Sequence, residues 1–263
     1  MTRIAAIQRW PVKGLGPDPL EDVELRAGDP LAFDRAWAIE NGPSGFDPVA
    51  PKPLPKSRFL MLMKNERLAA LATAFDAETR RLTIFRHGKQ VAAGRLDEPV
   101  GRSIIEQFFA AYMANELRGV PRLLSAEAHT FSDVGAPVVS LIGQGSLAEL
   151  ERVAGRTIDP LRFRANFHMA GLAPWAEFDL IGHRLALGAD VVLRVIEPIT
   201  RCAATNVDPA TGARDMQIPR LIDNAFGHSE FGVYAEVVQG GRVRRGDAMT
   251  VLDETSVRPA LPF

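Results

Sequence analysis

A single cysteine, Cys202, is the sequence feature that most narrows what this 263-residue chain can fold into. One thiol leaves no disulfide framework, no multi-cysteine zinc site and no iron–sulfur cluster within the chain. The fold must therefore rest on its apolar core, and a hydrophobic content of 46% is sufficient for one. The net charge of −1 argues against a general nucleic-acid or membrane-surface binder, which needs a basic excess.

Short strands separated by Gly- and Pro-rich turns dominate the pattern. No Gly-x-Gly-x-x-Gly motif links a strand to a helix, and no Walker-type loop occurs. The predicted fold class is therefore mainly β with a few helices, barrel-like rather than a doubly wound sheet. The predicted strands are residues 3–10, 22–26, 34–40, 68–75, 82–85, 162–169, 184–187, 190–197, 231–238 and 249–252, with 68–85 forming a hairpin.

Two helices are predicted between these strands. Apolar residues at helical spacing, with Pro99 near the start, indicate a helix over 99–115. A second helix spans 144–154, where Ser146 and Glu149 have the spacing of a capping box and Gly155 follows the last turn. Residues 42–56 are rich in Pro and Gly and predict a long surface loop, a type of segment that is often functional.

The chain shows no apolar stretch long enough for a transmembrane helix. Arg9 interrupts the apolar residues of the N-terminus, so no signal-peptide pattern is present. We therefore expect a cytoplasmic location.

The surroundings of Cys202 favour a chemical role. Arg201 is adjacent and would favour the thiolate, which is the form that acts as nucleophile or metal ligand. The cysteine also follows an apolar run and precedes a turn-rich loop, where reactive groups are usually presented. A small, inert, buried thiol is the alternative, because free cysteines are among the most buried residues.

Several charged residues stand at the ends of predicted strands. Lys13 follows the first strand, Asp34-Arg35 and Arg162-Phe163-Arg164-Ala165-Asn166 open later strands, and Ser132-Asp133 precedes another. Individually, such residues are usually solvated or form surface ion pairs. Together they describe a pocket for an anion, since Arg and Lys bind phosphate. Glu177 is either a polar group near this pocket or a surface residue, and the five histidines show no metal-ligand spacing.

The pattern as a whole resembles the MOSC family, named for the C-terminal domain of molybdenum-cofactor sulfurase. It is most similar to the members with an added N-terminal β-barrel, which include the amidoxime-reducing components. The most specific part of the resemblance is Arg201-Cys202 followed by Val207-Asp208-Pro209-Ala210-Thr211-Gly212. Further matching segments are Trp10-Pro11-Val12-Lys13, Gly28, Asp34-Arg35-Ala36-Trp37, Phe131-Ser132-Asp133, Ser146-Leu147, Arg162-Phe163-Arg164-Ala165-Asn166, Trp175-Ala176-Glu177, Phe231-Gly232 and Gly246-Asp247.

The resemblance implies two β-barrel-like domains. The first covers residues 1–95, a helical connector covers 96–125, and the MOSC domain covers 126–263. It also implies a molybdenum cofactor, a pterin dithiolene that holds molybdenum and carries a phosphate.

The resemblance also implies a role for each residue of the site. Cys202 would be the metal ligand and a catalytic residue, and a soft thiolate suits a metal already held by dithiolene sulfur. Asp133 would lie near the metal as a second catalytic residue. The remaining cofactor-binding positions are Lys13, Arg35 and Arg164 toward the phosphate, Asn166 toward the pterin, and Thr200 and Arg201.

The implied activity is reduction of N-hydroxylated compounds by a molybdenum oxidoreductase. Electrons would come from a separate donor protein of the ferredoxin, flavodoxin or cytochrome type, because the chain lacks cysteines for an iron–sulfur centre. The chain departs from the family pattern at Gly14, where a serine is frequent, at Ala165, where a proline is frequent, and at Phe178-Asp179 on the substrate side.

Two other interpretations stay open. In one, the chain is a carrier that passes a loaded cofactor, or sulfur from a persulfide on Cys202, to another enzyme. In the other, it is a small-molecule-binding barrel with an inert thiol. The family name is also linked to pyridoxal phosphate, but no lysine here has the setting of a Schiff base.

Overall fold

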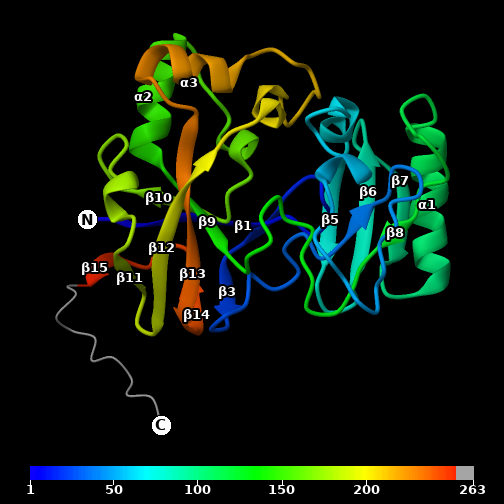
Figure 1. The fold of residues 1–263 in the computed structure, drawn as a ribbon, viewed down its shortest axis with the longest axis horizontal. Helices are drawn as coiled ribbons and strands as arrows, with labels where there is room; N and C mark the ends of the chain where they lie inside the picture. The colour runs from blue at the N-terminus through cyan, green and yellow to red at the C-terminus, as the bar shows by residue number, and fades with distance from the viewer. Residues whose placement is uncertain (253–263) are drawn as a thin grey trace.

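The computed structural model describes residues 1–252, and the remainder of the predicted second domain, 253–263, lies outside the described residues. The mainly β class with a few helices is confirmed (Figure 1). None of the helices within residues 1–252 combines the length and the apolar character needed to cross a membrane.

One eight-stranded sheet forms the larger part of the molecule, in the order β15-β11-β12-β13-β9-β10-β1-β2. Neighbouring strands are antiparallel except β9 and β10, which are parallel. A buried cluster of aliphatic side chains, among them Ile4, Leu193 and Val233, packs along this sheet. The strands are β1 (Arg3–Arg9), β2 (Asp18–Leu20), β9 (Val139–Gly143), β10 (Phe167–Ala170), β11 (Arg184–Leu187), β12 (Val191–Thr200), β13 (Glu230–Gln239) and β15 (Met249–Leu252).

Strand pairing joins the two ends of the chain. β1 pairs with β10 in the large sheet, and β3 (Asp22–Leu25) pairs with β14 (Gly241–Arg244). The first strands therefore complete the sheet of the second half, so that this pairing crosses the predicted division at residue 95. The division itself stays a prediction.

A smaller layer contains the predicted hairpin and the first helix. β5 (Ala72–Asp76), β6 (Arg81–Arg86) and β7 (Lys89–Arg95) form a three-stranded sheet, and α1 (Pro99–Tyr112) packs on β7 (Figure 1). The hairpin is confirmed, although its first strand begins at Ala72 rather than at residue 68, because residues 66–70 form a 3-10 turn. Gly94 and Gly101 permit the close approach, since a Cβ on Gly101 would lie 2.1 Å from the Arg95 carbonyl oxygen.

The second predicted helix is confirmed as α2 (Gln144–Ala154), ended by Gly155 in the left-handed conformation. Its predicted capping box is wrong. The residue before the helix is Gly143, and Ser146 Oγ instead donates to the buried Glu177 carboxylate at 2.6 Å. A third helix, α3 (Ile218–Phe226), packs beside α2 and was not predicted.

Two predicted strands are wrong over most of their length. Both segments contain basic residues whose side chains line the cavity described below. Residues 160–163 form a 3-10 turn, Arg164 has a φ of 52°, and strand β10 begins only at Phe167. Arg35 likewise has a φ of 50°, so the strand predicted at 34–40 shrinks to β4 (Ala38–Ile39), which pairs with β8 (Leu123–Leu124). The 3-10 turns are η1 (Lys56–Arg58), η2 (Glu66–Ala70), η3 (Pro160–Phe163), η4 (Phe178–Leu180) and η5 (Ala203–Asn206).

Candidate functional site

A cavity of about 420 Å³ lies between the two halves of the chain, and it brings together every residue assigned to the site from sequence. The first half lines it with residues 13–14, 34–35, 56 and 61–63, and the second half supplies the remainder. The predicted residues on its wall are Lys13, Arg35, Asp133, Arg164, Asn166, Thr200, Arg201 and Cys202.

Cys202 lies two residues after the end of β12 and immediately before the turn η5, at a strand end as its sequence position predicted. It is half-buried and not in a disulfide. Its carbonyl oxygen accepts from Thr205 N at 3.1 Å and from Thr205 Oγ1 at 2.9 Å. These bonds fix the backbone that carries the thiol at the cavity wall.

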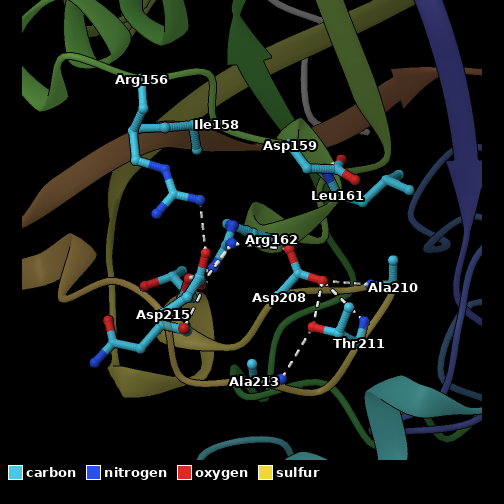
Figure 2. A network of polar contacts seen from close by, with 12 residues as sticks. Arg156, Ile158, Asp159, Leu161, Arg162, Asp208, Ala210, Thr211, Ala213 and Asp215 are labelled. Carbon is cyan, nitrogen blue, oxygen red and sulfur yellow. Dashed lines mark hydrogen bonds and ion pairs between the residues drawn. The ribbon is translucent and has the colours of Figure 1, made fainter.

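The loop after Cys202 is held by one buried arginine (Figure 2). Arg162 Nη2 donates to Asp208 Oδ2 at 3.1 Å and to Asp215 Oδ1 at 2.7 Å, and Nη1 donates to the carbonyls of Thr205 and Asn206. Asp208 Oδ1 in turn accepts from the backbone N–H groups of residues 210 and 211. The motif Val-Asp-Pro-x-Thr-Gly is therefore the scaffold of the cysteine loop.

The same loop is attached to the first half of the chain. Arg214 Nη2 donates to the Met63 carbonyl at 2.8 Å and to Glu66 Oε2 at 3.1 Å. Gly212 has a φ of 75°, and a Cβ there would lie 2.9 Å from the Glu66 carbonyl oxygen. Only glycine suits this position, because the backbone is left-handed and the neighbouring chain is close.

Three charged residues form a chain of ion pairs on one wall. Lys13 Nζ donates to Asp133 Oδ1 at 2.6 Å, and Lys56 Nζ donates to Asp133 Oδ2 at 3.1 Å. Burial alone would raise the pKa of Asp133, but Lys13 and Lys56 lower it to about 2. Burial lowers the pKa of Lys13; Asp133 opposes this, while Arg35 and Arg164 add to it. Asp133 is therefore ionised at neutral pH.

Lys56 lines the cavity together with Asp133 and Cys202. Burial would lower the pKa of Lys56, but its pairing with Asp133 and the nearby Cys202 raise it. Sequence reasoning missed this residue. Its only signal was its place at the end of the long Pro- and Gly-rich loop, which the sequence marked as a functional type of segment.

Arg35 and Arg164 line the cavity from opposite halves of the chain. Arg35 donates to Asp34 and, through Nη2, to the Arg164 carbonyl oxygen at 2.7 Å. Arg164 Nη1 donates to the Leu15 carbonyl oxygen at 2.7 Å, and its guanidinium carbon lies 4.1 Å from the Trp10 ring centroid. Burial lowers the pKa of the Arg164 guanidinium to about 9, and the neighbouring Arg35 acts in the same direction.

Arg201 is fixed in the same manner. Its Nη1 donates to the Phe163 carbonyl at 2.7 Å and its Nε donates to the Phe231 carbonyl at 2.8 Å. Burial lowers the pKa of the Arg201 guanidinium to about 10. The Nη2 atoms of Arg201 and Arg164 are both buried without a hydrogen-bond partner within residues 1–252. Such donors cost free energy unless a ligand accepts from them.

Unlike these arginines, Asn166 and Thr200 have no buried side-chain atom without a hydrogen-bond partner within residues 1–252. Asn166 Oδ1 accepts from both the backbone N and the Oγ of Ser140, and Nδ2 donates to the Gln8 carbonyl oxygen at 3.1 Å. The amide oxygen is thus committed to protein, and one Nδ2 hydrogen remains for a ligand. Thr200 Oγ1 lies 3.4 Å from Glu230 Oε1, at the outer end of β12.

Other cavity residues had no distinguishing sequence signal. Glu197 and Tyr234 line the wall from β12 and β13, in strands that were predicted without any functional assignment. Glu177 matches neither of its two interpretations, since it is buried but does not line the cavity. It accepts from Ser146 Oγ and from the Gly143 backbone N–H, and so anchors the start of α2.

The cavity carries an excess of positive charge. Its wall includes six basic residues (Lys13, Arg35, Lys56, Arg162, Arg164 and Arg201) and three acidic ones (Asp34, Asp133 and Glu197). Across the described part of the chain, no group of three or more His, Cys, Asp or Glu side chains is placed to hold a metal ion. The soft ligands that this cavity offers a metal are the Cys202 thiol and the weaker thioethers of Met61 and Met63.

These features define a β-sheet protein with a buried, basic cavity that contains one cysteine. Residues 127–250 match the family model described as the MOSC domain, so the second part of the chain contains a MOSC domain. The match includes the cysteine, its loop and the arginines of the second half.

Solved structures that show similarity to part of this chain include two YiiM proteins. YiiM from Geobacillus stearothermophilus is 19% identical over 45% of this chain and 55% of its own, with a TM-score of 0.36. YiiM from Escherichia coli is 16% identical over 44% and 54%, with a TM-score of 0.33. This chain thus spans about half the length of each. YUAD protein from Bacillus subtilis is 12% identical over 95% of this chain and 94% of its own, with a TM-score of 0.44. No curated protein matches the chain.

Proposed function

We propose that this protein binds a molybdenum cofactor in the cavity and reduces N-hydroxylated compounds there. One observation carries the proposal. Arg164 and Arg201, whose Nη2 atoms are buried without a hydrogen-bond partner within residues 1–252, line the same cavity as Cys202. This donor set matches a ligand that presents anionic oxygen at one end and a thiophilic metal at the other.

The residues present fit such a cofactor. Arg164 and Arg201 would donate to its anionic and polar oxygens, and both are held rigidly by backbone carbonyls. Lys13 and Arg35 add positive charge, although their side chains are already bonded to Asp133 and Asp34. Asn166 would offer its remaining Nδ2 hydrogen. Cys202 would be the protein's ligand to molybdenum.

When bound, the cofactor supplies two-electron reduction with removal of oxygen from the substrate. The protein's own residues would position the cofactor, exclude water and donate protons. Each reduction of an N–OH group to N–H releases water and consumes two protons. Lys13 Nζ holds a proton beside the ionised Asp133, and its lowered pKa makes it a stronger acid than an ordinary lysine. Lys13 is thus the residue best suited to return protons to the cavity.

The electron donor in this proposal is a separate protein of the ferredoxin, flavodoxin or cytochrome type. The chain has one cysteine, which the proposal assigns to molybdenum, so no thiolates remain for an iron–sulfur cluster. The cytoplasm would provide such donors and keep Cys202 reduced.

The proposal is tested by turnover with an artificial donor. Protein purified from a host that makes the cofactor should oxidise reduced methyl viologen when N-hydroxybenzamidine is added, and Cys202→Ala should abolish this activity. Loss of N-hydroxybenzamidine and formation of benzamidine are followed by chromatography. A molybdenum-loaded protein that gives no turnover would instead support the carrier interpretation, in which the loaded cofactor is passed on.

A further inference from the structure

One guanidinium group bridges the cysteine loop and the methionine-containing wall of the cavity. Arg214 Nη1 donates to the carbonyl oxygen of Ala203, which follows Cys202 directly, at 3.2 Å. Nη2 of the same side chain donates to the carbonyl oxygens of Leu62 at 3.2 Å and Met63 at 2.8 Å. Because both nitrogens belong to one rigid, planar group, these carbonyls are held close together. Arg214 therefore fixes the spacing between the backbone beside the cysteine and this wall.

Arg214 acts on the cavity from its outer side. Cys202 and residues 61–63 line the cavity, whereas Arg214 is exposed and does not line it. Its bonds reach the two wall segments through their backbone carbonyls. We call the contact between these two wall segments the seam. A closed seam limits how far the methionine wall can move away from the thiol.

The cysteine loop is rigid where it carries Arg214. The backbone of Arg214 pairs with that of the buried Val207, and Asp208 N donates to the Ala213 carbonyl oxygen at 2.7 Å. The buried Arg162 in turn holds the Asp208 carboxylate at 3.1 Å. Arg214 thus extends from a closed and anchored turn, so its guanidinium is directed at the seam by the backbone.

The methionine wall is also ordered. Asn65 is buried, its backbone N donates to the Met61 carbonyl oxygen at 2.8 Å, and its Oδ1 accepts from Met61 N at 3.1 Å. Asn65 Nδ2 donates to Glu116 Oε2 at 2.9 Å, which attaches this turn to the chain beyond α1. The turn leaves the Leu62 and Met63 carbonyls available to Arg214.

Close packing accompanies these bonds. A Cβ on Gly212 would lie 2.9 Å from the Glu66 carbonyl oxygen and 3.6 Å from the Ala70 Cβ. The Glu66 carboxylate also pairs with Arg214 at 3.1 Å. The two surfaces are therefore in direct contact at the seam, and the guanidinium spans that contact.

We propose that Arg214 is a positioning residue that sets the width of the cavity beside Cys202, and so limits the size of the group that reaches the thiol or a metal bound to it. A bulky group reaches Cys202 when the wall moves away, and this local opening requires the guanidinium to release its carbonyls. As a statement about substrate size this inference rests on the proposed function, whereas access to the thiol is measured without molybdenum.

Two maleimides that differ in size measure this access. Cys202 is the one cysteine of the chain, so intact-mass spectrometry follows its alkylation without a background from other thiols. N-ethylmaleimide is the small reagent and N-(1-pyrenyl)maleimide is the bulky one. Both are applied to the full chain produced in a host that cannot make the cofactor, and the molybdenum content of each sample is determined in parallel.

Arg214→Met should raise the rate constant for the pyrenyl reagent at least about fivefold and that for the ethyl reagent less than about twofold, because the lost bonds favour the open seam. Arg214→Lys should give an intermediate rate, since an ammonium group is a compact charge without the planar fork. Gly212→Ala should act in the same direction as Arg214→Met, because the added methyl group separates the two surfaces.

Arg156→Met is the matched control for these variants. Arg156 bonds to Asp215, beside the cysteine loop, rather than across the seam. The substitution should change neither alkylation rate.

Turnover provides a second readout in molybdenum-loaded protein. Arg214→Met should raise kcat/KM for N-hydroxy-4-phenylbenzamidine relative to kcat/KM for N-hydroxybenzamidine. A general loss of folded protein would lower both values alike, so the ratio reports the positioning role.

Equal pyrenyl rates in wild type and Arg214→Met, an equal rise for both reagents, or the same rise in Arg156→Met would each overturn the positioning role. A shifted ratio of the two alkylation rates, in a protein that acquires no molybdenum even from a host that makes the cofactor, would support the seam and reject the proposed function. Active, molybdenum-loaded protein in which Arg214→Met moves neither the alkylation ratio nor the substrate ratio would do the reverse.

Discussion

Replacing Arg162 with methionine is expected to lower the free energy of unfolding by about 3–5 kcal/mol, the range seen when one partner of a buried ion pair is removed. The Arg162 side chain is 2% exposed and its two carboxylate partners, Asp208 and Asp215, are each 25% exposed. The substitution removes the donor to Asp208 Oδ2, to Asp215 Oδ1 and to two backbone carbonyls, and leaves the other oxygen of each carboxylate bonded. Chemical denaturation monitored by tryptophan fluorescence measures the change.

Arg156 provides the matched control for this effect. It bonds to Asp215 in the same network but is 53% exposed (Figure 2). Arg156→Met should change the free energy of unfolding by less than about 1 kcal/mol, because exposed ion pairs contribute little. Similar losses in the two variants would contradict the assignment of Arg162 as the residue that holds the cysteine loop.

Replacing Arg164 with methionine is expected to reduce the cofactor content of the purified protein at least about tenfold, the equivalent of one lost charge-assisted hydrogen bond. Its effect on the stability of cofactor-free protein should be small, within about 1 kcal/mol. The variant loses the bond to the Leu15 carbonyl, but it also removes a buried charge that has an unpartnered nitrogen. Arg164→Met should therefore reduce cofactor binding strongly while changing the free energy of unfolding only slightly.

This comparison requires cofactor-free protein, because a bound ligand stabilises the fold in proportion to its affinity. Arg152→Met is the control, since Arg152 is exposed on α2 and, within residues 1–252, pairs with Glu149 alone. Arg152→Met should change neither the cofactor content nor the free energy of unfolding. Full cofactor content in Arg164→Met would show that the unpartnered guanidinium does not contact the cofactor.

The regular elements of the fold were predictable because local patterns and burial agree there. α2 begins and ends where the sequence indicated, and Gly155 adopts the left-handed conformation that ends a helix. The strand predicted at 162–169 failed because Arg162 and Arg164 are drawn into tertiary bonds that no alternation of residues encodes. The sequence also did not reveal that β1 joins the sheet of the second half, since such pairing depends on contacts distant in sequence.

Some residues of the candidate site could be predicted from the sequence, and others were found only in the structure. The family motif led to the cysteine and the basic residues, and all eight predicted positions line one cavity. The roles of Asn166 and Lys13 needed the structure, because both are largely bonded to protein groups. Lys56, Glu197 and Tyr234 belong to an ordinary loop and two ordinary strands, so only tertiary packing brings them to the cavity.

The most direct test of the central claim is the molybdenum content of purified protein, compared between wild type and Cys202→Ala. Both should be produced in a host that makes the cofactor and analysed by elemental mass spectrometry. We expect close to one molybdenum per wild-type chain and almost none in the variant, because Cys202 is the protein ligand that the proposal assigns to the metal. Equal molybdenum in the two proteins, or none in the wild type, would contradict this account of the cavity.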